Sequence, residues 1–144
     1  MPETSKTCRW GVLGTASIAR KVVRAMHQAR NAHPLAIASR TLDRASVFAT
    51  DHGLDRAHGS YESLLEDPEI DAVYIPLPTG VRRDWVLKAA AAGKHVLCEK
   101  PIGLTSDEGQ QLVDAGKRHP ELKLMEADRK STRLNSSHAN ISYA

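Results

Sequence analysis

The 144-residue chain has little of what several specialised protein classes need. It contains only two cysteines, Cys8 and Cys98, and one phenylalanine, and no apolar run approaches the ~20 residues of a membrane span. Two cysteines inside apolar runs are typical of buried packing residues in a reduced, cytoplasmic chain, not of a disulfide framework. The seven histidines are scattered without metal-ligand spacing, so we assign no metal.

The chain also lacks a strong excess of charge. Its 20 lysines and arginines and 17 aspartates and glutamates give a net charge of +3. Residues 128–144 hold three of the basic side chains and one of the acidic ones, so the remainder carries 17 basic and 16 acidic groups, a net +1. We therefore expect no basic face for nucleic acid, and no membrane partner.

The end of the chain, residues 128–144, reads DRKSTRLNSSHANISYA. Back-translated with suitable codons, it resembles a widely used short-read sequencing adaptor carrying a six-base index. The alternative is a natural tail rich in serine and asparagine. We interpret 128–144 as an adaptor-derived tail that is not native, and exclude it from fold reasoning. Residues 1–7 then form a polar lead, and residues 8–127 one domain of an incomplete gene product.

Short apolar runs alternate with amphipathic stretches of helical length along this domain. Repeated strand–helix alternation predicts a parallel sheet with helices on both faces, and continuously apolar strands are typical of such sheets. The fold class we expect is α/β, a doubly wound, Rossmann-like parallel sheet. We expect strands at 8–13, 34–39, near 57, at 71–75, 95–98 and from 122, and helices at 17–29, 42–52, 61–67, 81–92 and 105–118.

Unusual residues gather where four of the expected strands end. In doubly wound sheets, ligands bind outside the carboxyl ends of the strands, near the point where the strand order reverses. Four such clusters at four strand ends would arise by chance less often than a single cluster would. They are Gly14, Thr15, Ala16, Ser17 and Ile18; Ser39 and Arg40; Pro76, Leu77, Pro78 and Thr79; and Glu99, Lys100 and Pro101.

The first cluster is a degraded G-x-G-x-x-G dinucleotide-binding motif. Gly14 allows the tight turn, whereas Ala16 and Ala19 occupy the second and third glycine positions. The methyl group of Ala16 limits how closely a pyrophosphate can approach the backbone, but the amides up to Ile18 can still bind phosphate oxygens at a helix N-terminus. Taken alone, the loop is equally compatible with an ordinary strand–helix turn.

The second cluster bears on which nucleotide binds. An NAD site usually ends its second strand with Asp or Glu, whose carboxylate accepts the ribose hydroxyls. Here Ser39 and Arg40 stand at that place, and the first acid is Asp43. A hydroxyl and a guanidinium suit a 2′-phosphate, so the sequence favours NADP, with NAD as the other possible cofactor. A surface arginine at a helix start is the alternative explanation of Arg40.

Together these segments resemble the N-terminal half of the glucose–fructose oxidoreductase/inositol dehydrogenase/MocA family, and in particular its NADP-using branch. The matching segments are RWGVLGTASIARK, AIASRTLDRA, YESLLEDPEIDAVYIPLPTG, KAAAAGKHVLCEKPIGLT and LMEA, within residues 9–127. The resemblance implies an oxidoreductase that transfers a hydride between NADP(H) and a carbonyl or alcohol of a sugar, polyol or cyclic diol. It also implies a second, α+β substrate domain that this chain lacks. We therefore expect the fragment to be inactive, the small-molecule substrate to bind through the missing domain, and the parent to be a homo-oligomer.

The resemblance also implies roles for individual residues. Lys100 takes the place of a catalytic lysine beside the nicotinamide and the substrate carbinol, where a cation would polarise a carbonyl. Glu99 would contact the nicotinamide ribose, and the loop from Pro76 to Thr79 would pass under it. Relatives commonly carry Asn at the position of Thr79 and His at that of Arg82, so no role of that histidine transfers to this chain.

Two other hypotheses remain. Some relatives in the family are regulators that bind NADP, so the chain could be a non-catalytic NADP-binding sensor. The intact Glu99-Lys100-Pro101 argues against a sensor, because a sensor needs no polarising lysine. A short, stand-alone binding module is the third hypothesis, and it requires residues 128–144 to be native.

Overall fold

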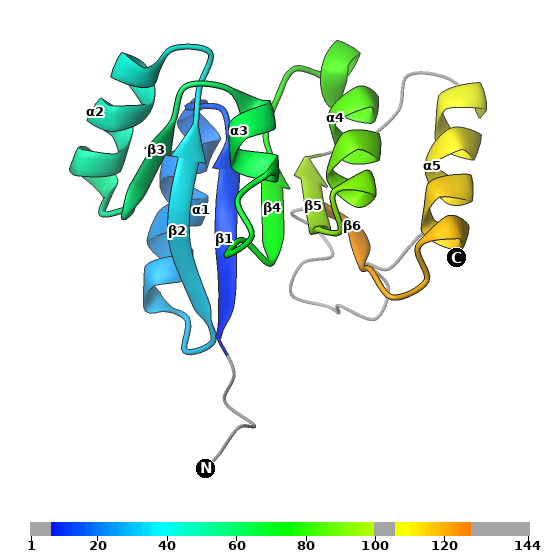
Figure 1. The fold of residues 1–144 in the computed structure, drawn as a ribbon, viewed down its shortest axis with the longest axis horizontal. Coiled ribbons are helices and arrows are strands. Elements are labelled where there is room, and N and C mark those ends of the chain that lie inside the picture. Colours follow the sequence, from blue (N-terminus) through cyan, green and yellow to red (C-terminus); the bar gives the residue numbers. More distant parts are fainter. Residues whose placement is uncertain (1–6, 100–105, 128–144) are drawn as a thin grey trace. The chain divides into compact units, whose positions relative to one another are not determined.

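The computed structural model describes residues 7–99 and 106–127. Its strands form a six-stranded parallel sheet in the order β3-β2-β1-β4-β5-β6, so the predicted doubly wound α/β fold is confirmed (Figure 1). The strand order reverses between β1 and β4, as it does in Rossmann-like sheets. The elements are β1 (Cys8–Leu13), α1 (Ser17–Gln28), β2 (Ala32–Ala38), α2 (Leu42–His52), β3 (Arg56–His58), α3 (Tyr61–Leu65), β4 (Ala72–Ile75), α4 (Thr79–Ala91), β5 (His95–Glu99), α5 (Ser106–Arg118) and β6 (Leu124–Ala127).

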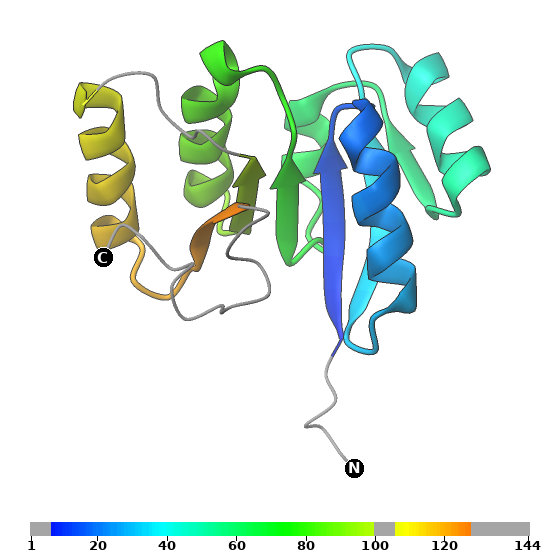
Figure 2. The same ribbon diagram turned by 180° about the vertical axis from the view of Figure 1, so that it is seen from behind.

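Residues up to Val73 form one compact unit, called unit 1 below. In it α1 covers one face of β1 and β2, and α3 covers the other (Figures 1 and 2). Helix α3 packs closely because Gly11 has no side chain: a Cβ added there would lie 2.6 Å from a methyl carbon of Leu64. The pairing of β1 with β2 shifts register after Trp10, whose partner in β2 is Pro34. Proline has no amide hydrogen to donate to the neighbouring strand, so it is well accommodated at such a bulge.

Residues from Tyr74 onward form the second compact unit, unit 2. Its strand β5 pairs in parallel with β6, with Val96 facing Leu124, and α4 packs against both β5 and α5. All four residues of β4 are buried, which fits a strand covered on both faces.

Local sequence signals place several helix ends correctly. Ser60 caps α3 as predicted, because its hydroxyl oxygen accepts a hydrogen bond from the Ser63 amide at 3.1 Å. Gly53 ends α2 with a φ of 73°, the left-handed conformation that glycine adopts without strain. Gly93, which follows α4, has a φ of 81°.

Other local predictions are corrected by the structure. Helix α4 begins at Thr79 and not at Val81, so Thr79 belongs to the helix and not to the preceding loop. Gly80 is therefore the second residue of the helix. Cys98 is buried as expected, whereas Cys8 is only half-buried because it is the first residue of its strand.

The structure bears on membrane and metal sites only where it describes the chain. Within residues 7–99 and 106–127, no helix has both the length and the apolar character to span a bilayer. In the same part of the chain, His, Cys, Asp and Glu form no group of three or more that could hold a metal ion. Residues 128–144 lie outside the described residues, so their adaptor origin stays a prediction.

Candidate functional site

The turn after β1 is built around Gly14. Its φ is 103°, a conformation that side-chain-bearing residues rarely adopt. Its amide donates a hydrogen bond to the carbonyl oxygen of Ala38 at 2.8 Å, which ties the end of β1 to the end of β2. The first two predicted clusters, from Gly14 and from Ser39, therefore begin at adjacent strand ends in unit 1.

The N-terminus of α1 has no side-chain cap. Ala16 holds the N-cap position and makes no side-chain cap hydrogen bond, and no acidic residue lies in the first turn. Helix α2 differs, because the Thr41 hydroxyl oxygen accepts from the Arg44 amide at 3.3 Å. The start of α1 therefore offers an anion backbone amide donors and the positive end of the helix dipole.

The end of β2 presents a buried serine and an exposed arginine. Ser39 is 5% exposed, and its amide donates to the carbonyl oxygen of His58 at 3.1 Å. Burial raises the pKa of the Tyr61 phenol, and the positive charge of Arg40 opposes that rise. Arg40 itself is exposed.

A hollow of about 350 Å³ in unit 1 is lined by residues of the turn after β1, of α1 and of α2. Two cations not singled out by the sequence, Arg20 of α1 and Arg44 of α2, contribute to its wall together with Thr15. Their positions within the first turns of helices that follow two predicted clusters could have indicated them. The lining residues are Thr15, Arg20, Asp43, Arg44, Val47, Phe48, Asp51 and His52.

The third predicted cluster follows β4 in unit 2. Pro76 and Leu77 are buried and Pro78 is exposed. The carbonyl oxygen of Leu77 accepts a hydrogen bond from Nε of Arg82, one turn into α4. Arg82 therefore holds the backbone of this loop.

The fourth cluster begins at Glu99, the last residue of β5. Its carboxylate accepts a hydrogen bond from the hydroxyl of Tyr74, which is completely buried in β4. Burial, followed by the hydrogen bond and charge of Glu99, raises the pKa of Tyr74. A tyrosine in an otherwise aliphatic strand signals a hydroxyl that needs a partner, but the sequence alone does not identify that partner. Lys100 and Pro101 lie outside the described residues.

Comparison with known proteins gives a consistent result. A family model described as "Oxidoreductase family, NAD-binding Rossmann fold" (Gfo/Idh/MocA) matches residues 8–126. The chain is 51% identical over 111 residues to an uncharacterised oxidoreductase of Rhizobium meliloti, covering 76% of this chain and 33% of that protein. It is 50% identical over 105 residues to D-xylose 1-dehydrogenase (NADP(+)) 2 of Haloferax volcanii, covering 73% and 32%.

Solved structures agree with this family assignment. The crystal structure of KijD10, a 3-ketoreductase from Actinomadura kijaniata in complex with TDP-benzene and NADP, superimposes with a TM-score of 0.78 at 38% identity. The match covers 84% of this chain and 38% of the reductase chain. The present chain spans about a third of the length of the curated relatives that it matches.

Proposed function

The chain belongs to the Gfo/Idh/MocA oxidoreductase family through its NAD-binding Rossmann domain, and on that premise we propose that this domain binds NADP(H) in preference to NAD(H). We further propose that the protein to which the domain belongs is a cytoplasmic oxidoreductase interconverting a carbonyl and an alcohol on a sugar, polyol or cyclic diol. Relatives include a D-xylose dehydrogenase and a 3-ketoreductase, which supports this class of substrate.

One observation carries the cofactor preference: the end of β2 holds a hydroxyl and a guanidinium in place of an acid. Ser39 is held by the backbone of β3, and Arg40 is exposed beside it. A ribose 2′-phosphate accepts charge-assisted hydrogen bonds from such donors, whereas an NAD ribose lacks the phosphate that would use them. The uncapped start of α1 suits the pyrophosphate of either nucleotide.

The proposed chemistry assigns the remaining clusters to the nicotinamide half. A bound nicotinamide supplies or accepts the hydride. Glu99 would bind the nicotinamide ribose, and the backbone from Pro76 to Thr79 would support it. Lys100, by its resemblance to the family lysine, would donate a hydrogen bond to the substrate oxygen and stabilise the negative charge that develops there. Substrate and subunit contacts are proposed to lie in the part of the family's fold that this chain does not include.

The test is a titration of the chain with NADPH and with NADH, followed by the fluorescence of the reduced nicotinamide. We expect Arg40→Ala to weaken NADPH roughly 10- to 100-fold, as befits a charge-assisted contact to phosphate, and to leave NADH within about twofold.

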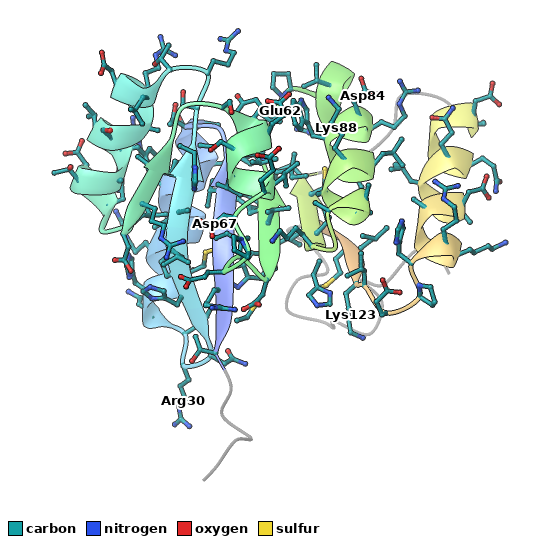
Figure 3. The ribbon with its side chains drawn as sticks, viewed as in Figure 1. Arg30, Glu62, Asp67, Asp84, Lys88 and Lys123 are labelled. Atoms are coloured by element: carbon teal, nitrogen blue, oxygen red, sulfur yellow. The ribbon has the colours of Figure 1, made fainter. Side chains whose placement is uncertain are left out.

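Arg30→Ala is the matched control. Arg30 follows α1 at the opposite end of the strands, where Figure 3 labels it, so the variant removes the same charge away from the proposed site. We expect it to leave both affinities unchanged. Failure of the unmodified chain to bind either nucleotide would contradict the proposed function, and an equal loss of both nucleotides in Arg40→Ala would contradict the NADP preference.

A further inference from the structure

The contact between Tyr74 and Glu99 joins two segments of unit 2 that are far apart in the chain. Tyr74 lies in the last half of β4, two residues before Pro76, and Glu99 ends the neighbouring strand β5. The phenol hydroxyl donates to one carboxylate oxygen, Oε2 of Glu99. Tyr74 has no exposed surface, whereas Glu99 is half-buried.

A phenylalanine would serve the packing of β4 equally well, so the hydroxyl needs its own explanation. A buried hydroxyl costs free energy unless it is hydrogen-bonded, and a bond to a carboxylate is stronger than one to a neutral acceptor. The raised pKa of Tyr74 keeps the phenol protonated and hence a donor throughout the neutral range. The donated bond also restricts the rotamers of Glu99, because one oxygen has a fixed partner.

We propose that Tyr74 is a positioning residue that holds Oε2 of Glu99 and thereby aims the second carboxylate oxygen, Oε1, at a vicinal diol of the ligand. The inference rests on the proposed function, in which that diol is the nicotinamide ribose. Because β4 leads directly into the segment beginning at Pro76, the same bond also ties the start of that segment to the end of β5. Tyr74 touches neither cofactor nor substrate in this role.

The decisive measurement compares two ligands that differ in the nicotinamide half. NADPH contains the nicotinamide ribose, whereas adenosine 2′,5′-bisphosphate contains only the adenosine half with its 2′-phosphate. We expect Tyr74→Phe to weaken NADPH roughly tenfold, about 1.4 kcal/mol, and to leave the bisphosphate unchanged. A merely structural role would lower both affinities together, so the ratio of the two dissociation constants separates the explanations.

A double-mutant cycle shows whether Tyr74 acts through Glu99. In a Glu99→Ala background, Tyr74→Phe should have no further effect on NADPH, because the carboxylate that it orients is gone. Tyr61→Phe is the matched control in unit 1. It should change the dissociation constants of NADPH and of the bisphosphate by the same factor. Additive effects of Tyr74→Phe and Glu99→Ala would overturn the proposal.

A second measurement needs no variant and covers the case in which Tyr74→Phe does not fold. In the unmodified chain labelled with [ζ-¹³C]tyrosine, NADPH should shift the Tyr74 resonance and adenosine 2′,5′-bisphosphate should not. If the chain binds NADPH and both ligands leave that resonance unmoved, the inference is wrong while the proposed function stands. If the chain binds no NADPH, the proposed function and the inference fall together.

Discussion

Helices α1 and α3 of unit 1 both begin at carboxyl ends of strands, yet their N-termini use polar groups in opposite ways. At α3, the Ser60 hydroxyl oxygen accepts from the Ser63 amide, and the Ser63 hydroxyl contacts Nδ1 of His58 at 2.8 Å. The other ring nitrogen of His58 contacts the buried Asp67. At α1, Ala16 offers no side-chain oxygen at all.

The polar groups around α3 stabilise the fold, whereas those at the start of α1 bind a ligand in the proposed complex. Asp67, which is labelled in Figure 3, follows α3 and is only 7% exposed. It accepts two hydrogen bonds from Arg56, at 2.9 and 2.7 Å, and one from the Glu69 amide. The network around α3 thus satisfies its own donors and acceptors, whereas the amides at the start of α1 are completed by an anion in the proposed complex.

Introducing a side-chain cap at α1 should remove the difference between the two helix N-termini, and we expect it to have the largest effect of the changes considered. We expect Ala16→Asp to raise the thermal stability, because the new carboxylate accepts from the first amides in the manner of an N-cap and adds about 1 kcal/mol. The same charge would repel the pyrophosphate, so NADPH affinity should fall about 100-fold. Thermal unfolding and nicotinamide fluorescence measure the two effects.

Ala16→Ser provides the uncharged control. It should stabilise the helix to a similar extent and weaken NADPH less than the aspartate does. If Ala16→Asp leaves the NADPH affinity intact, the start of α1 is not the phosphate site.

Opening the network at α3 should reduce stability without changing ligand binding. Asp67→Asn removes the charge that pairs with Arg56, and we expect a loss of about 2 kcal/mol in the free energy of unfolding. The value lies below that for a fully buried pair because the Arg56 side chain is 39% exposed. Urea denaturation measures the loss, and an unchanged free energy would show that the network is not structural.

The same network predicts an acid dependence of stability. Burial would by itself raise the pKa of Asp67, but the hydrogen bonds from Arg56, the Glu69 amide and His58 lower it below its ordinary value of 3.8. A carboxylate whose pKa is lower in the folded state stabilises that state above its unfolded pKa, and the contribution disappears as the pH falls through the folded pKa. Unfolding free energies between pH 6 and pH 2 should therefore fall less steeply in Asp67→Asn than in the unmodified chain.

Removing the cap of α3 gives the smallest of these effects. Ser60→Ala should lower the free energy of unfolding by about 1 kcal/mol, because the Ser63 amide loses its side-chain acceptor. Differential scanning calorimetry would detect the change. A loss of NADPH affinity with no loss of stability would show that the start of α3 binds the ligand, and would contradict its structural role.

The contrast also shows which features can be predicted from a single sequence. The Ser60 cap and the glycine after α2 were predictable because both depend on residues within one turn of the helix end. The order of alternating strands and helices likewise determined the fold class. The start of α4 was not predictable, since proline and glycine at 78 and 80 are typical of a loop and are equally compatible with a first helical turn.

The side-chain partners are the part that a sequence does not specify. Tyr74 and Glu99 are 25 positions apart, and Arg56 and Asp67 are 11 apart. Their pairing depends on which strands become neighbours and on where each helix ends, and these follow from packing of the whole unit. The Lys100 assignment depends on family resemblance alone and stays a prediction.

Gly11 has a consequence for the evolution of this domain. Three side-chain carbons of Leu64 lie within 3.2 Å of the point where a Cβ on residue 11 would stand, and Leu64 has no exposed surface into which it could turn. A larger residue at position 11 is therefore compatible with the fold only if position 64 becomes smaller. We expect these two positions to covary among homologues, with glycine facing leucine or a bulkier residue facing alanine.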